Sequence, residues 1–414
     1  MYNNRGDFVF FSQFKSLTLP IKILLVTVLL AHLSYYLVLP IFPILLKVVK
    51  GLTILQIGTV LAVSSFSYQG GSILGGYLAD QFGRRTVITV GAFIKGLALI
   101  GFGLATSYPM LIVVALFNGI GGGLNAPSTK AAIAEITSKQ GDQTTVFSLR
   151  GIAANMGIGV AGLLVYTVFG NQSSSVFYVA AVIFFLVGTL SWFFVPSECD
   201  TQPCDKVPIR SYLQVFRNKA YIAFSAMSIL IWGLYVQFAL ALPLTGERIL
   251  DNPAAVSLIW TINSLLVVVF QTFITNKIIK RISSMTAFAI GALFIGIGIS
   301  SLYYATNFYF LIFSGLIFII GEMIIMPTVD IVITRISAGQ LMSTYFGIAN
   351  FVAGLGEGLG NFSGSRLLSI GLGSYLPWLT YLSVAILIAI LIYSVRLFPP
   401  IQKAFSKPPE GSHV

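Results

Sequence analysis

Long apolar stretches separated by short polar turns dominate this sequence. Twelve stretches are each long enough for a bilayer-spanning helix, which needs about 20 residues. They cover residues 20–46, 53–79, 86–106, 109–137, 144–169, 174–195, 220–244, 253–276, 284–306, 308–334, 341–370 and 375–397. Because a lipid-exposed backbone must satisfy its own hydrogen bonds, the pattern predicts an all-α membrane protein with twelve transmembrane helices.

One polar connection is much longer than the others and divides the chain. Residues 196–219 are charged and contain Pro196, Pro203 and Pro208. We therefore expect two pseudo-symmetric six-helix bundles. The expected division is an N-terminal bundle at 1–195, a cytoplasmic linker at 196–219, a C-terminal bundle at 220–397 and a cytoplasmic tail at 398–414. Glycine-rich stretches recur in spans five and eleven, which predicts that these helices lie at the contact between the halves.

Composition excludes a soluble protein. Hydrophobic residues make up 56% and charged residues 9% of the 414 residues, whereas soluble domains carry about 25% charged residues. The basic residues do not cluster on a soluble domain, so we expect no nucleic-acid partner. Cys199 and Cys204 lie in the polar connection without a nearby histidine, so we expect neither a metal site nor a stable disulfide.

The distribution of lysine and arginine sets the orientation. With the N-terminus inside, 18 of the 24 basic residues fall on the inner side and 4 on the outer side. The outer four are Lys47, Lys50, Arg248 and Arg366. Since inner loops carry the excess of positive charge, both termini are predicted to be cytoplasmic.

A short turn between spans two and three has unusual chemistry. Residues 76–85 read Gly-Tyr-Leu-Ala-Asp-Gln-Phe-Gly-Arg-Arg. Asp80 can form a charge-assisted cluster with Arg84 and Arg85. Gly83 permits the positive backbone dihedral of a tight turn, and Gly76 with its neighbour at position 75 permits close approach of another helix.

This turn resembles the signature loop of the major facilitator superfamily, with Gln81 at a commonly basic position. Residues 150–162 of span five resemble the glycine motif of the superfamily's 12-span drug:proton antiporters, although Val160 and Ala161 replace its Gly-Pro pair. The resemblance implies the superfamily's fold, alternating access between the halves and a monomer in a bacterial cytoplasmic (inner) membrane. It implies a transporter and not an enzyme, with a small-molecule substrate, protons and lipid as partners and no cofactor beyond the proton gradient.

The expected function is proton-coupled efflux of small amphipathic molecules, of the multidrug type. Two alternatives stay open, namely export of a specific endogenous metabolite such as a siderophore, and proton-coupled uptake of a small solute. The sequence has no phosphate-binding Gly-Lys-Ser/Thr motif, which argues against transport driven directly by ATP.

Three ionisable residues near the middle of spans are candidates for the proton-coupling step. Glu322 lies in span ten, Glu357 in span eleven and His32 in span one. Ionisable groups at this depth are costly and therefore mark functional sites by default. We expect Glu322 to lead, followed by Glu357; an ionised acid would favour a cationic or amphipathic substrate. The alternative is a hydrogen-bonded structural role for each.

Other polar residues are expected in the substrate cavity or in gating ion pairs. The cavity candidates are Asn118, Asn125, Tyr235, Gln237, Asn263 and Gln271. The ion-pair candidates are Glu135 near Arg84, Arg85 or Arg150, and Asp330 near Arg335. Lys95, in span three, is expected to pair with an acid or to lie along a groove in a mainly structural role.

Overall fold

The computed structural model describes residues 17–138, 143–170, 173–196, 215–337, 342–395 and 397–400, and within these ranges the chain is helical. The first span consists of α2 (Leu19–Val38), η1 (Leu39–Ile41), α3 (Phe42–Ile44) and η2 (Leu45–Val49). The N-terminal bundle continues with α4 (Ile54–Phe82), α5 (Arg84–Leu104), α6 (Tyr108–Ser138), α7 (Gln143–Leu164), η3 (Val165–Phe169) and α8 (Ser175–Phe194). The C-terminal bundle contains α10 (Lys219–Ile249), η5 (Pro253–Ala255), α11 (Val256–Lys277), η6 (Ile279–Arg281), α12 (Ser284–Ser301), η7 (Leu302–Tyr304), α13 (Phe308–Ser337), α14 (Met342–Leu368) and α15 (Leu376–Val395).

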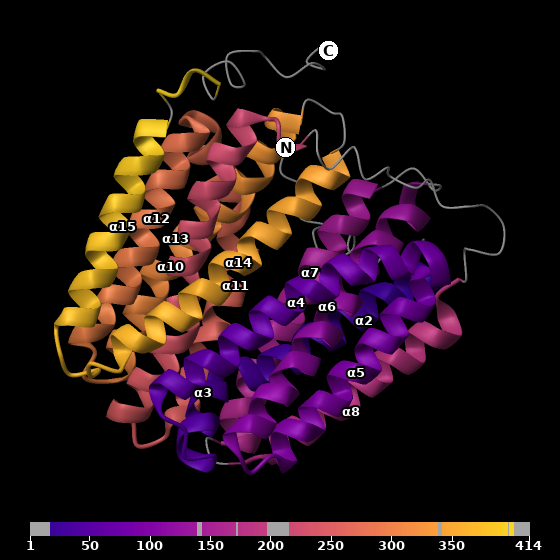
Figure 1. Ribbon diagram of the computed structural model, residues 1–414, viewed down its shortest axis with the longest axis horizontal. Coiled ribbons are helices and arrows are strands. Elements are labelled where there is room, and N and C mark those ends of the chain that lie inside the picture. The colour runs from indigo at the N-terminus through magenta and orange to yellow at the C-terminus, as the bar shows by residue number, and fades with distance from the viewer. Residues whose placement is uncertain are drawn as a thin grey trace, which may run out of the picture.

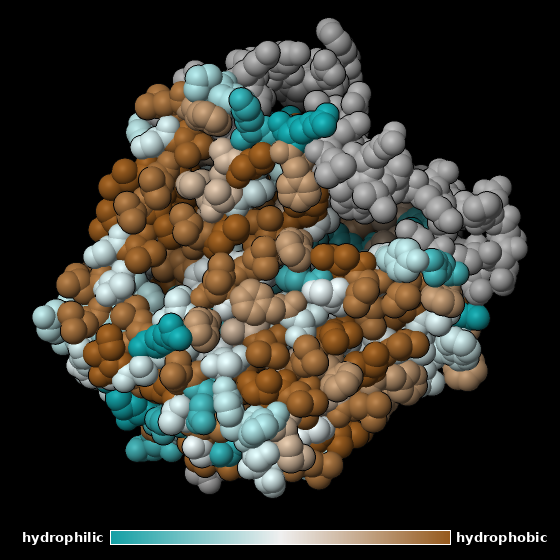
Figure 2. Space-filling view, viewed as in Figure 1, coloured by the Kyte–Doolittle hydropathy of each residue, from teal (hydrophilic) through white to brown (hydrophobic). Residues whose placement is uncertain are grey.

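Each predicted span coincides with a long helix, and the helices form two bundles side by side (Figure 1). The all-α membrane fold is therefore confirmed. Figure 2 shows apolar residues over most of one face of the molecule, as contact with lipid requires. Most of the predicted linker lies outside the described residues, so the domain boundaries stay a prediction.

Two helices are less apolar than the rest. Ten of the described helices are long and apolar enough to cross a membrane by length and composition, and α4 and α14 are not among them. These two helices pack against each other across the boundary between the bundles. Several of their polar residues, among them Gln69 of α4 and Asn361 with Ser365 of α14, are buried inside the protein, which accounts for the lower hydropathy of both helices.

Helix α4 turns into α5 at a single residue. Thr53 begins α4 with a capping box that involves Gln56, and Gly83 ends it with φ 80° and ψ 149°. Only glycine adopts this combination readily, so the expectation for Gly83 is confirmed. A Cβ at Gly75 would lie 3.2 Å from the Leu124 Cα of α6, whereas one at Gly76 would meet nothing within 4 Å. The prediction that Gly76 permits close helix contact is therefore wrong.

The bundles meet through α4 against α14 and α7 against α11. Spans five and eleven lie at this contact, as their glycines predicted. Ser257 of α11 donates to the Gly162 carbonyl at 2.7 Å, and Thr261 donates to the Gly159 carbonyl at 2.9 Å. A Cβ at Gly162 would overlap the Ser257 carbonyl oxygen. This close approach is thus possible only because residue 162 has no side chain.

An ion pair also joins the two bundles. Lys47 in η2 donates to the Glu247 carboxylate of α10 at 2.5 Å. It lies at the same end of the molecule as the α7–α11 hydrogen bonds, opposite the Gly83 turn. From this end the bundles diverge (Figure 1). We name this joined end the outer latch, because the distribution of basic residues predicts that it faces the outside. It consists of Lys47, Glu247, Gly162, Ser257 and Thr261.

We expect charge reversal at Lys47 to loosen the outer latch. Lys47→Glu places two carboxylates together, and Glu247→Lys places two ammonium groups together. The measurement is the rate at which a membrane-impermeant maleimide, added outside cells, labels Leu61→Cys in the cavity between the bundles. The background carries Cys199→Ser and Cys204→Ser. Each single reversal should raise the rate about two- to fivefold, since a half-exposed pair contributes about 1 kcal/mol or less.

The matched control is the double reversal, Lys47→Glu with Glu247→Lys, which restores the attraction and should return labelling to the starting rate. Equal rates in all four proteins would show that the pair contributes nothing to closure.

Candidate functional site

A cavity lies between the bundles in two connected parts. We name the part near the outer latch the deep chamber (about 300 Å³) and the part toward the diverging ends the vestibule (about 490 Å³). They share eight lining residues: Tyr35, Ser64, Ser65, Lys95, Asn118, Phe184, Trp232 and Glu357. Such a cavity between two helical repeats is the typical place for a transporter's substrate.

The deep chamber is largely aromatic and apolar. Tyr36 of α2 meets Trp260 of α11 edge to face, with ring centroids 5.6 Å apart. Trp232 and Tyr235 of α10 pack at 5.2 Å. Phe42 completes the wall toward the outer latch. These surfaces suit the apolar part of a small molecule, with few polar groups to orient it.

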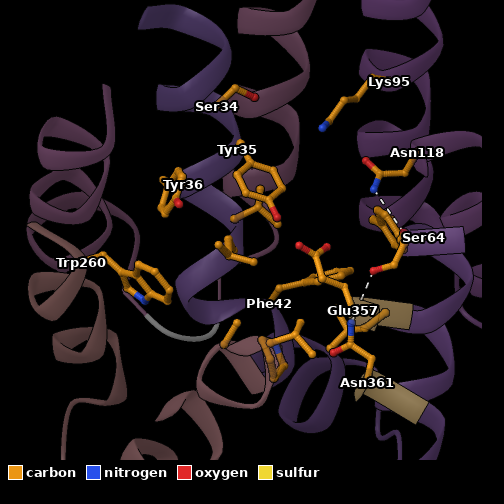
Figure 3. Close-up of a pocket in the computed structure, with 18 of the residues that line it drawn as sticks. Ser34, Tyr35, Tyr36, Phe42, Ser64, Lys95, Asn118, Trp260, Glu357 and Asn361 are labelled. Atoms are coloured by element: carbon orange, nitrogen blue, oxygen red, sulfur yellow. Dashed lines mark hydrogen bonds between the residues drawn. The ribbon is translucent and has the colours of Figure 1, made fainter. Parts of the chain in front are cut away.

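Glu357 is the acid that faces this space. Its carboxylate projects from α14 toward Tyr35 and Ser64, and it lines both parts of the cavity (Figure 3). Among the described residues that line the cavity it is the one carboxylate. Below it, Asn361 donates to the Ser65 hydroxyl of α4 at 3.4 Å across the bundle contact.

Glu322 lies behind the cavity wall. The Tyr235 hydroxyl donates to the Glu322 carboxylate at 3.1 Å, and Tyr235 lines the deep chamber. The structure therefore places one predicted acid in the cavity and the other one hydrogen bond away. Tyr235 therefore stands between Glu322 and the deep chamber.

The vestibule contains basic side chains from the N-terminal bundle. His32, Lys130 and Arg150 line it. His32 Nδ1 lies 2.8 Å from the Val28 carbonyl, so this nitrogen carries the proton and Nε2 is left for other partners. The Arg150 Nε is buried without a hydrogen-bond partner among the described residues.

The predicted cavity amides divide into two groups. Asn118 and Asn125 line the vestibule, where Asn118 donates to Ser64 at 3.3 Å and Asn125 to the Ile88 carbonyl at 2.9 Å. The others lie away from both parts of the cavity. Gln237 donates to the Gly360 carbonyl, Gln271 donates to the Met323 carbonyl, and Asn263 is buried with both amide atoms unpartnered in the described structure.

The signature turn is fixed to two neighbouring helices. The Arg84 guanidinium donates to the Ala131 carbonyl at 2.6 Å and pairs with Glu135 of α6. Arg85 lies over the Trp192 ring of α8, 4.8 Å from its centroid. The side chain of Asp80 lies outside the described residues.

The second predicted ion pair, Asp330 with Arg335, stays a prediction. Asp330 lies exposed on α13, where Lys130 of α6 acts on it electrostatically across the gap between the bundles. Arg335 lies exposed further along the same helix.

Lys95, which the sequence analysis expected to be mainly structural, lines both parts of the cavity. It projects from α5 past α6 into the cavity, and its ammonium lies 5.0 Å from the Tyr35 ring centroid and 4.9 Å from that of Phe184. A Cβ at Gly122 would lie 3.2 Å from its Nζ. The glycines of α6 were the signal that could have revealed this passage.

Comparisons with known proteins agree with the fold. The family model described as Major Facilitator Superfamily matches residues 24–360. The chain is 28% identical over 335 residues to YqjV of Bacillus subtilis (strain 168), described as an uncharacterized MFS-type transporter, over 78% of this chain and 80% of that one. It is 22% identical over 366 residues to the multidrug resistance protein MdtH of Escherichia coli (strain K12 / DH10B), over 88% and 90%.

A solved structure has the same fold. A mutant of the nucleoside transporter NupG superposes with a TM-score of 0.79 at 14% identity, over 90% of this chain and 99% of that one. Taken with the family match over most of the chain, these findings identify the protein as an integral membrane transporter that belongs to the Major Facilitator Superfamily.

Proposed function

We propose that this transporter exports small amphipathic molecules in exchange for protons, across a bacterial cytoplasmic membrane. The observation that carries the proposal is Glu357, an acid at mid-helix that faces an aromatic cavity between the two bundles. A carboxyl in this position can hold a proton or a substrate's cationic group, but not both. That competition is the minimum requirement for exchange.

Alternating access follows from the two ends of the cavity. The outer latch holds the bundles together at one end, while the vestibule opens between the diverging bundles at the other. Substrate enters the vestibule and moves to the deep chamber. Opening the latch while Lys130 and Asp330 come together would then turn the cavity outward.

On this geometry we assign the proton first to Glu357 and second to Glu322, which reverses the order expected from the sequence. Glu322 reaches the cavity through the Tyr235 hydroxyl, so it can adjust the charge at the cavity wall without touching substrate. His32 is the third titratable group on the path, nearer the vestibule.

The description of one relative supports the proposed direction of transport, which is export, and the proposed wide range of substrates. MdtH carries the description of a multidrug resistance protein, and the aromatic deep chamber suits several apolar shapes. Uptake of a solute and export of a single metabolite use the same fold and are the competing outcomes of the tests below.

We expect Glu357→Gln to abolish uphill transport, because glutamine imitates a permanently protonated acid. In proteoliposomes with an imposed pH gradient, accumulation of a fluorescent amphipathic amine should fall to background. Exchange of the same probe without a gradient should persist at higher probe concentrations, because the variant loses the carboxylate that pairs with the amine but keeps the aromatic cavity. The control is Glu322→Gln, which should lower the rate and retain uphill accumulation.

Retained uphill accumulation in Glu357→Gln, with loss of it in Glu322→Gln, would return the proton to Glu322. Uphill accumulation retained in both variants would show that neither acid carries the coupled proton, and it would overturn the proposed proton coupling.

We also expect the diverging ends to face the cytoplasm. Single cysteines at Ser173 and Ser283, in the background without Cys199 and Cys204, lie at opposite ends of the helices. An impermeant maleimide added to intact cells should label Ser173→Cys at once and Ser283→Cys only after lysis. The opposite pattern would reverse the topology and the direction of transport.

A further inference from the structure

We propose that Lys95 binds the anionic group of the substrate opposite Glu357, so that the transported molecules are aromatic zwitterions with a carboxylate and an amine. This inference rests on the proposed function, because it concerns the cavity assigned to transport. It adds a substrate class and a specificity-determining residue to it.

The first argument is the missing counter-ion. A lysine inside a bundle usually pairs with an acid, since an unpaired charge removed from water is costly. Lys95 contacts the Tyr35 and Phe184 rings, and within the described ranges no carboxylate lies within ion-pair distance of its ammonium. The two rings offset part of the cost through their faces. They leave the three ammonium hydrogens without an anionic acceptor.

The second argument is the position of the side chain. Lys95 starts on α5, whose Leu99 and Phe102 also line the deep chamber, and its ammonium lies beside Gly122 of α6, where the two parts of the cavity meet. A Cβ at position 122 would lie 3.2 Å from the Lys95 Nζ, so a larger side chain there would crowd the ammonium. The charge is therefore delivered to a place where water, ions and substrate can reach it.

The third argument is the arrangement opposite Lys95. In Figure 3 the ammonium of Lys95 and the carboxylate of Glu357 point from opposite sides into one space, with Tyr35 on one wall and Asn118 with Ser64 on the other. The two charged groups are too far apart for an ion pair and share the Tyr35 environment. A molecule with both charges fits between them, and its aromatic part lies toward Trp260 and Phe42 of the deep chamber.

The charge balance of the cavity favours an anion as well. Lys130 and Arg150 line the vestibule, and Lys95 lines both parts, against one described carboxylate in the cavity lining, Glu357. A purely cationic substrate would pass these basic groups before it reached Glu357. A carboxylate on the substrate turns this repulsion into attraction.

This geometry gives the proton a definite course. When the substrate's ammonium binds, the Glu357 carboxylic acid releases its proton to vestibule water and becomes the carboxylate that pairs with the ammonium. The substrate's carboxylate pairs with Lys95, whose charge does not change. A proton that later binds Glu357 displaces the substrate's ammonium, so that Lys95 is then the one charged group that still binds the substrate.

The test uses four molecules on one aromatic core. They are 3-(1-naphthyl)alanine, its carboxamide without the carboxylate, its N-acetyl derivative without the ammonium, and the N-acetyl carboxamide without either. Binding to the purified full-length transporter is measured without a gradient, by calorimetry and by quenching of tryptophan fluorescence, since Trp232 and Trp260 line the deep chamber. Wild type should bind the zwitterion about tenfold or more tightly than each singly charged relative.

The variants separate the two charges. Lys95→Gln should weaken the zwitterion and the N-acetyl derivative about tenfold or more and leave the carboxamide unchanged; Lys95→Arg should restore most of the loss. Glu357→Gln should weaken the zwitterion and the carboxamide and leave the N-acetyl derivative unchanged. Gly122→Val, which crowds the ammonium of Lys95, should resemble Lys95→Gln.

Equal effects of Lys95→Gln on all four molecules, or none, would overturn the proposal and make Lys95 a structural residue. A wild type without preference for the zwitterion would also overturn it. If Lys95→Gln does not fold, Lys95→Arg and the melting temperature of wild type with each molecule give the same decision. Failure of proton coupling is distinguishable, because it would leave these equilibrium preferences intact and abolish only gradient-driven accumulation.

Discussion

The contact between α7 and α11 is the constraint on which the rest of the structure depends. Hydroxyls of Ser257 and Thr261 bind backbone carbonyls at Gly162 and Gly159, so the two helices meet almost without intervening side chains. In lipid there is little hydrophobic drive for two helices to associate, and packing with hydrogen bonds replaces it. Holding one end this tightly leaves the other end free to diverge, and the cavity is the space that results.

Much of this fold is visible in the sequence because a bilayer imposes a simple rule. Apolar length gave every span, and glycine in spans five and eleven located the bundle contact. The single-residue turn at Gly83 followed from its neighbours. Polar residues inside α4 and α14 lower the mean hydropathy of these two helices. The length of each stretch and its place between two turns still identified both helices as spans.

The cavity was less predictable, because the pattern of apolar and polar residues does not show which face of a buried helix lines the cavity. Gln237 and Gln271 are polar residues of the kind that line cavities. In the structure their side-chain amides instead donate hydrogen bonds to nearby backbone carbonyls. Glu322 and Glu357 are equivalent by depth, and only the rotation of α13 and α14 separates them. Lys95 was expected to have a mainly structural role, because the space that its ammonium occupies depends on Gly122 of a neighbouring helix and not on its own helix alone.

The use of main-chain carbonyls as acceptors in the outer latch has an evolutionary consequence. A backbone carbonyl is present at every position, whatever the residue. The outer latch therefore requires small residues on α7 and hydroxyl side chains on α11, but little else. Residues that line the cavity can then diverge without disturbing this contact between the bundles. A scaffold built this way can acquire a new cargo by changing a few side chains, while the contact that joins its two bundles is inherited unaltered.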